Sequence, residues 1–97
     1  MATRPPPQIV AVSFQTDRVI DRARFQNLLR SLGTRILRLK GNIEFGEGPR
    51  FVEVVYDKFS EKPACEALGP NTAFTAIASQ ISTDELRVLL EATRKTA

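Results

Sequence analysis

The sequence predicts an α+β fold, a two-layer sandwich in which two helices cover one face of a mixed, mostly antiparallel four-stranded sheet. Two observations predict it. Apolar residues alternate with a period of two in three segments, a fourth segment is short, small and apolar, and two others repeat apolar residues with the helical period, in the order β-α-β-β-β-α. Each predicted helix has a single apolar stripe, so both can cover the same sheet face. A chain of 97 residues is long enough for one such domain.

The domain is predicted to occupy residues 8–97, because residues 1–7 end in three prolines and suit a tail or linker. Residues 8–15 alternate apolar with small or polar side chains, which is typical of a strand. A helix is expected from Asp21, a favourable N-cap, to about Leu32, and Gly33 follows at the C-terminal cap position. Its buried stripe would consist of Phe25, Leu28, Leu29 and Leu32.

The second strand, residues 36–45, should form a hairpin with a third, residues 50–59. Residues 60–71 contain two prolines and a glycine and are predicted to be mainly loop. Residues 72–79 are small and apolar, which favours a central strand with a helix packed closely over it. A right-handed crossover would make the first two strands parallel.

The last helix has the strongest local signal. Ser82 can cap it by accepting a hydrogen bond from the Glu85 N–H, while the Glu85 carboxylate reaches back to the Ser82 N–H. Ile81 and Leu86 have the spacing of a hydrophobic staple. Two cations at residues 94–95 suit the C-terminal end of the helix dipole, so we expect the helix to end there. The apolar stripe continues through Leu89, Leu90 and Thr93.

A basic stripe on the second strand is the candidate functional surface. Arg38 and Lys40 alternate with leucines and run directly into Gly41. The cations could contact a partner, or they could pair with Glu53 or Glu44 across the hairpin; the sequence leaves both open. Gly41 is expected to mark a bulge or a close backbone approach. A period of two places both cations opposite an apolar face formed by Leu37, Leu39, Ile43 and Phe45.

The composition excludes several classes of site. The chain has no histidine and one cysteine, Cys65, so it can form neither a histidine-based triad nor an internal disulfide. Cys65 could be a metal ligand or a redox thiol, but an inert residue is favoured. Asp57, Glu61 and Glu66 are expected to be solvated acids rather than a catalytic pair. We therefore expect no catalytic, cofactor-binding or metal-binding residues and no cofactor.

Charge is unevenly distributed along the chain. Seven cations lie between Arg18 and Lys40 against one acid, Asp21, although the net charge is only +3. Such asymmetry is typical of a solvated helix face or of an anionic partner. No apolar run approaches the roughly 20 residues that span a bilayer, and the first residues lack the apolar centre of a signal peptide. We expect a cytoplasmic protein with no membrane partner, since a lone cysteine suits a reducing compartment.

Several segments together resemble the C-terminal domain of the CobW-type GTPases, metallochaperones named for a protein of cobalamin synthesis. Those domains have a strand ending in Ser-Phe, a helix, and a strand with Leu-Arg-x-Lys-Gly, which correspond here to residues 13–14, 21–32 and 37–41. A hairpin partner, a strand of small residues and an Asp-Glu-Leu helix start follow at residues 51–59, 72–79 and 84–86. The resemblance covers residues 8–95.

The resemblance implies an accessory, protein-interaction domain that serves metal (cobalt or zinc) or cobalamin-related cofactor delivery. Its partner would be the family's GTPase domain, in cis or in trans, a client metalloprotein or a second copy of the chain. Arg38, Lys40 and Gly41 would form the interaction surface. The GTPase domain's phosphate loop and cysteine-rich metal motif do not occur here, so we expect no enzyme activity. Many family members have histidines after the third strand, and their absence here argues against a metal role.

The alternative is a small basic α+β module that binds nucleic acid through the cations of residues 18–40. Sheet-based RNA binders stack bases on exposed aromatic side chains of their strands. On the predicted third strand, Glu53 shares a face with Phe51, and an acid there would repel phosphate. We therefore do not expect nucleic acid to be the partner.

Overall fold

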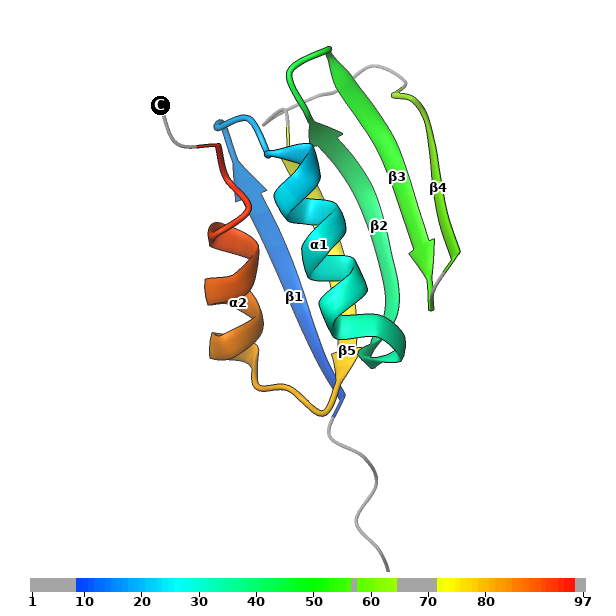
Figure 1. Ribbon diagram of the computed structural model, residues 1–97, viewed down its shortest axis with the longest axis vertical. Helices are drawn as coiled ribbons and strands as arrows, with labels where there is room; N and C mark the ends of the chain where they lie inside the picture. Colours follow the sequence, from blue (N-terminus) through cyan, green and yellow to red (C-terminus); the bar gives the residue numbers. More distant parts are fainter. Residues whose placement is uncertain (1–8, 57, 65–71, 96–97) are drawn as a thin grey trace, which may run out of the picture.

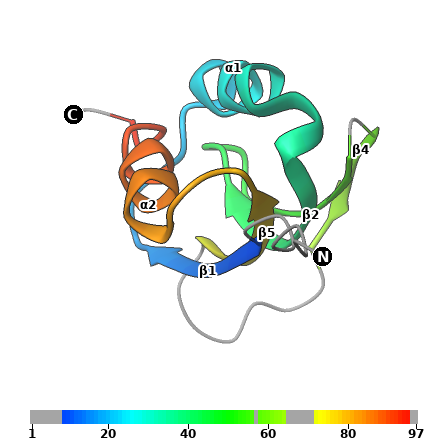
Figure 2. The ribbon, with the colours of Figure 1, turned by 90° about the horizontal axis from the view of Figure 1, so that it is seen from below.

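A computed structural model describes residues 9–56, 58–64 and 72–95. In this part of the chain, two helices lie on one face of a five-stranded sheet (Figures 1 and 2). The helices are α1 (Arg22–Leu32) and α2 (Thr83–Glu91), and a 3₁₀ turn, Gly33–Arg35, follows α1. The strands are β1 (Ile9–Thr16), β2 (Ile36–Glu44), β3 (Pro49–Val55), β4 (Lys58–Pro63) and β5 (Thr72–Ser79). The predicted α+β sandwich is confirmed, with one more strand than expected.

The strands are ordered β1-β5-β2-β3-β4, and every neighbouring pair is antiparallel. Because β1 and β2 are both antiparallel to β5, they run in the same direction, as the crossover through α1 predicts. They do not pair with each other, since β5 lies between them. The sheet is therefore antiparallel rather than mixed, and the small-residue strand β5 is internal, as predicted.

The additional strand arises where the predicted third strand, residues 50–59, divides in two. Tyr56 has a φ of 57°, in the left-handed region that residues with side chains seldom adopt. The backbone leaves the extended conformation there, and β4 folds back on β3, with Val54 opposite Phe59. A continuous strand would place Tyr56 on the same face as Val52 and Val54, but Tyr56 is 55% exposed while both valines are buried.

Helix α1 begins and ends where the sequence predicts. The Asp21 carboxylate accepts a hydrogen bond from the Arg24 N–H at 3.0 Å, and Gly33 caps the C-terminus with a φ of 54°. Of the predicted apolar stripe, three residues are buried and Leu29 is only half-buried. Leu29 lies on the flank of α1 that faces the outer strands.

Helix α2 is capped by Ser82, whose Oγ accepts from the Glu85 N–H at 3.1 Å, as predicted. It ends at Glu91, three residues before the expected cations. The chain then turns back to the end of β1, because the Asp21 N–H donates to the Thr93 carbonyl at 2.8 Å and the Lys95 N–H donates to the Val19 carbonyl at 2.7 Å. These bonds fasten α2 to the start of α1.

The core lies between the sheet and the helices and is centred on Phe25, which is completely buried. Its ring lies edge-on to Phe45 and Phe74, with centroids 5.8 and 6.3 Å apart. Beneath the helices, Ala76 and Ala78 of β5 are also completely buried, so small side chains admit close packing of the helix layer. Among the described residues, no helix is long and apolar enough to cross a membrane.

Candidate functional site

Arg38 and Lys40 are exposed on the sheet face that the helices leave uncovered, called here the open face. The strand pattern predicted this orientation. The predicted apolar side needs one correction, because the pairing of β2 with β5 shifts register between Ile36 and Arg38. The shift places Ile36 in the core instead of Leu37, which is half-buried.

The two cations have different surroundings. Arg38 Nη2 lies 3.3 Å from the Glu53 carboxylate, in an ion pair whose side chains are 54% and 34% exposed. Lys40 Nζ lies 5.9 Å from the centroid of the Phe51 ring, and Lys62 Nζ of β4 lies 5.3 Å from the same centroid. Glu53 and Glu44 were the two acids that could pair with these cations, and of these two only Glu53 forms an ion pair. Glu44 instead accepts hydrogen bonds from two backbone N–H groups of the following turn, at 2.7 and 2.9 Å.

The centre of the open face is an aromatic ring between two ammonium groups. By register, Phe51 lies beside Asn42 on one side and Lys62 on the other, and Lys40 lies beside Glu53. Among the described residues of these strands, Glu53 is therefore the acid on this central area, and Arg38 already neutralises it. The area combines an apolar centre with a surplus of positive charge, which suits an acidic surface with an apolar contact.

Gly41 has a different position from the two cations. Its backbone φ is 154°, and a Cβ added there would collide with the Ala73 carbonyl oxygen and with Phe74 of the neighbouring strand. Its register partners, Val52 and Phe74, are both buried residues of the core. Gly41 therefore permits close approach of β2 and β5 on the helix side, and the predicted close backbone contact is confirmed. It does not lie on the open face with Arg38 and Lys40.

An ion cluster that the sequence did not reveal joins α1 to the outer strands. Both Glu61 carboxylate oxygens accept from the Arg22 guanidinium, at 2.8 and 2.9 Å, and the Arg50 Nε also donates to Glu61, at 2.9 Å. The hydrogen bond from Arg22 is the main reason that the pKa of Glu61 falls to about 2, and Arg50 adds to it. The Arg22 guanidinium also lies 4.2 Å from the centroid of the Phe45 ring. Glu61, expected to be a solvated acid, is instead bound by two arginines and partly buried.

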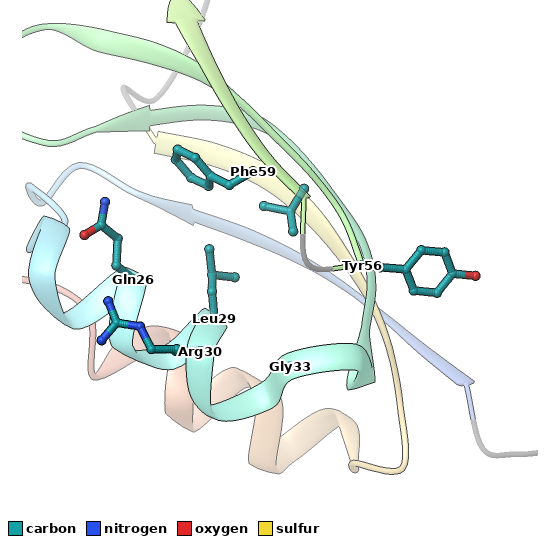
Figure 3. A pocket seen from close by; sticks show the side chains of 7 residues that line it. Gln26, Leu29, Arg30, Gly33, Tyr56 and Phe59 are labelled. Carbon is teal, nitrogen blue, oxygen red and sulfur yellow. The ribbon is translucent and has the colours of Figure 1, made fainter.

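A groove of about 470 Å³ lies on the helix side, between α1 and the β3–β4 hairpin (Figure 3). Leu29 and Gln26 point from α1 toward the strands, Phe59 of β4 faces them, and Tyr56 points away at one end. Arg30 and Gly33 complete the α1 side, and the buried Val54 forms part of the strand side. The sequence could not indicate this groove, because it depends on the fold-back at Tyr56.

The remaining predicted residues do not gather into one site. Asp57, Cys65 and Glu66 lie outside the described residues. Within the described part of the chain, no group of three or more metal-ligating side chains is present. The cations between residues 18 and 40 are divided between the two layers: Arg22 binds Glu61, Arg30 lines the groove, and Arg38 and Lys40 lie on the open face.

Solved structures similar to this chain include the Zn(II)-bound YjiA GTPase from E. coli, with a TM-score of 0.67 at 21% identity. A Zn(II)-bound triple mutant of YjiA GTPase gives a TM-score of 0.68 at 19% identity. Both comparisons cover 90% of this chain but only 30% of the other, so this chain corresponds to about a third of those proteins. At this identity the likeness shows a shared fold.

The sequence comparison identifies the family. No curated protein matches the chain. A family model, described as the C-terminal domain of the cobalamin synthesis protein cobW, matches residues 9–94, which is nearly the whole length. The chain therefore belongs to the family of CobW C-terminal domains.

Proposed function

We propose that this chain is the accessory, protein-interaction domain of a CobW-type GTPase and that it has no catalytic activity of its own. Its role would be to couple the GTPase to delivery of a metal such as cobalt or zinc, or of a cobalamin-related cofactor, in the cytoplasm. The partner would be the family's GTPase domain, in cis or in trans, or the client metalloprotein.

The observation that carries the proposal is the exposed open face in a domain of this family. That face has two features of a binding surface, namely exposed cations and an aromatic centre. The helices need the apolar face of the sheet, which leaves Arg38 and Lys40 on the other side, and Phe51 supplies a half-buried aromatic centre between Lys40 and Lys62. Aromatic residues and arginine, such as Phe51 and Arg38 here, are enriched at protein interfaces.

Charge reversal on the open face tests the proposal. The double substitution Arg38→Glu with Lys40→Glu should leave the fold intact, because exposed charges contribute little to stability. It should weaken association with a GTPase domain of the family, most strongly at low salt, where electrostatic attraction is least screened. Arg18→Glu with Arg87→Glu makes the same change in net charge at exposed positions outside the sheet and should have a much smaller effect.

Binding assays with a short duplex and a single-stranded oligonucleotide separate the proposal from the nucleic-acid alternative. If the open-face double mutant keeps its affinity for the GTPase domain but loses binding to an oligonucleotide, the basic stripe serves nucleic acid instead. If the double mutant unfolds, the stripe contributes to the folded core and the assignment of the open face is wrong.

A further inference from the structure

The helix layer is narrower than the sheet it covers. Strands lie about 4.8 Å apart, so five strands extend over roughly 19 Å between the outermost axes. The axes of two packed helices lie about 8–10 Å apart, which is about the distance spanned by the axes of three strands. Here α2 packs over β1 and α1 lies beside it, which leaves β3 and β4 beyond the flank of α1 (Figure 1). The groove occupies this uncovered part of the helix side.

The walls of the groove are apolar although they reach solvent. Phe59 is 38% exposed, and Leu29 is half-buried, with the buried Val54 beside them. Phe59 and Val54 are register partners, so both project from the helix side of the hairpin. A helix-facing side chain that no helix covers leaves apolar surface in water, which a partner would remove.

The ion cluster fastens one wall of the groove to the other near the start of α1. Glu61 lies two residues beyond Phe59 on β4 and binds Arg22 at the first turn of α1. The cluster therefore fastens β4 to the first turn of α1, and the groove lies further along the helix, between Gln26 and Gly33. Such preorganisation lowers the entropic cost of binding.

The positive charge on the α1 side of the groove favours a negatively charged partner. Helix α1 contains three arginines and no acid. Arg22 is bound to Glu61, whereas Arg30 lies at the groove. Within the part of the chain that the structure describes, the Arg30 side chain makes one long hydrogen bond, 3.4 Å, to the Asn27 side chain of its own helix. An element that lies against this flank is favoured if it carries carboxylates.

We propose that the groove between α1 and the β3–β4 hairpin binds an amphipathic helix of a partner protein, which completes the helix layer. Apolar side chains of that helix, at the spacing of successive turns, enter between Leu29 and Phe59, and acidic side chains on its flank face Arg30. This site is on the opposite side of the sheet from the open face and does not depend on the function proposed for that face.

Selection from two peptide libraries tests the proposal. One library displays an alanine-rich helix with randomised positions, and the other displays extended peptides of the same length; both are selected against the 97-residue chain. We expect helical binders with apolar residues at i, i+3 or i+4, and i+7, together with Asp or Glu on one flank. Phe59→Ser should weaken the selected peptide at least about tenfold, as loss of a central anchor does.

Matched variants make the result specific. Arg30→Glu should also weaken binding, and replacing the peptide's acids by lysine should restore it. Val88→Ser and Arg87→Glu make comparable changes, an apolar side chain to serine and a reversal of charge, at exposed positions of α2, and they should alter the affinity less than twofold. Circular dichroism verifies that each variant is folded. If Phe59→Ser unfolds the domain, Arg30→Glu still tests the groove, because Arg30 is exposed and its replacement should not disturb the fold.

Four outcomes would overturn the proposal. The first is recovery of no binders, and the second is recovery only of extended peptides, which would indicate strand addition to β4. The third is helical binders that are insensitive to Phe59→Ser and Arg30→Glu. The fourth is a wild-type dimer in sedimentation that Phe59→Ser dissociates, which would show that a second copy occupies the groove.

Discussion

Removal of the Glu61 carboxylate should destabilise the domain in a pH-dependent way. Glu61→Gln keeps the shape of the side chain but leaves the guanidinium groups of Arg22 and Arg50 without their anion. Glu61 is 16% exposed, so it is better shielded from water than the other described acid in a salt bridge, Glu53, at 34%. The substitution should therefore cost more than the corresponding change at Glu53.

The magnitude follows from the pKa of Glu61. A decrease from 4.5 to about 2 corresponds to roughly 3 kcal/mol, since one pKa unit is worth about 1.4 kcal/mol. The side chains of Arg22 and Arg50 are 34% and 31% exposed, so water screens part of the interaction. We expect Glu61→Gln to lower the free energy of unfolding by about 1–2 kcal/mol at pH 7.

The pH dependence has a definite sign. Because the pKa is lower in the folded state, the carboxylate stabilises the fold fully above about pH 4.5, and this contribution is lost as the pH falls toward 2. Urea unfolding of wild type and Glu61→Gln between pH 7 and pH 2 should show a difference that shrinks across this window. Glu53→Gln, on the exposed pair with Arg38, should cost under about 1 kcal/mol.

Two results would refute this reasoning. If Glu61→Gln were as stable as wild type at pH 7, the cluster would contribute nothing beyond its desolvation cost. If the difference between the two proteins were the same at pH 2 as at pH 7, the effect would come from packing of the side chain and not from its charge.

Two further predictions concern the backbone and the last helix. Gly41→Ala should cost at least about 2 kcal/mol, because the new methyl group would collide with Phe74 on β5. Gly48→Ala, also at positive φ but with no atom of the described residues within 4 Å of the added methyl group, should cost about 1 kcal/mol. Ser82→Ala should cost about 1 kcal/mol through loss of the cap, and Leu90→Ala about 2–5 kcal/mol through the cavity it leaves. Denaturant melts of the four variants check both rankings; a reversal in either pair would contradict the corresponding packing argument.

The local features of the fold could be predicted from the sequence because their signals are short-range. Asp21 and Ser82 cap their helices, and Gly33 ends α1, as residue type and spacing alone indicate. The outward orientation of Arg38 and Lys40 followed from the period of two in β2. Each of these inferences needs only a few consecutive residues.

The features that were missed either lack a clear local signal or depend on contacts between distant segments. The chain folds back at Tyr56, whose φ is positive, and neither glycine nor asparagine occupies that position to indicate such a turn in the sequence. The edge strand β4 contains Lys58, Lys62 and Pro63, a composition typical of edges and of loops alike. Its position determines the Glu61 cluster and the groove, so neither could be derived before the strand was placed. Strand order was also beyond the sequence pattern, which does not say that β5 inserts between β1 and β2.

The central claim is that the open face of this domain contacts a GTPase domain of its family. Hydroxyl-radical footprinting tests it directly, because Phe51 on the open face and Phe59 in the groove are both partly exposed and lie on opposite sides of the sheet. If the open face is the contact surface, the GTPase domain should protect Phe51 from oxidation and leave Phe59 unchanged. Protection of Phe59 with Phe51 still fully reactive would contradict it.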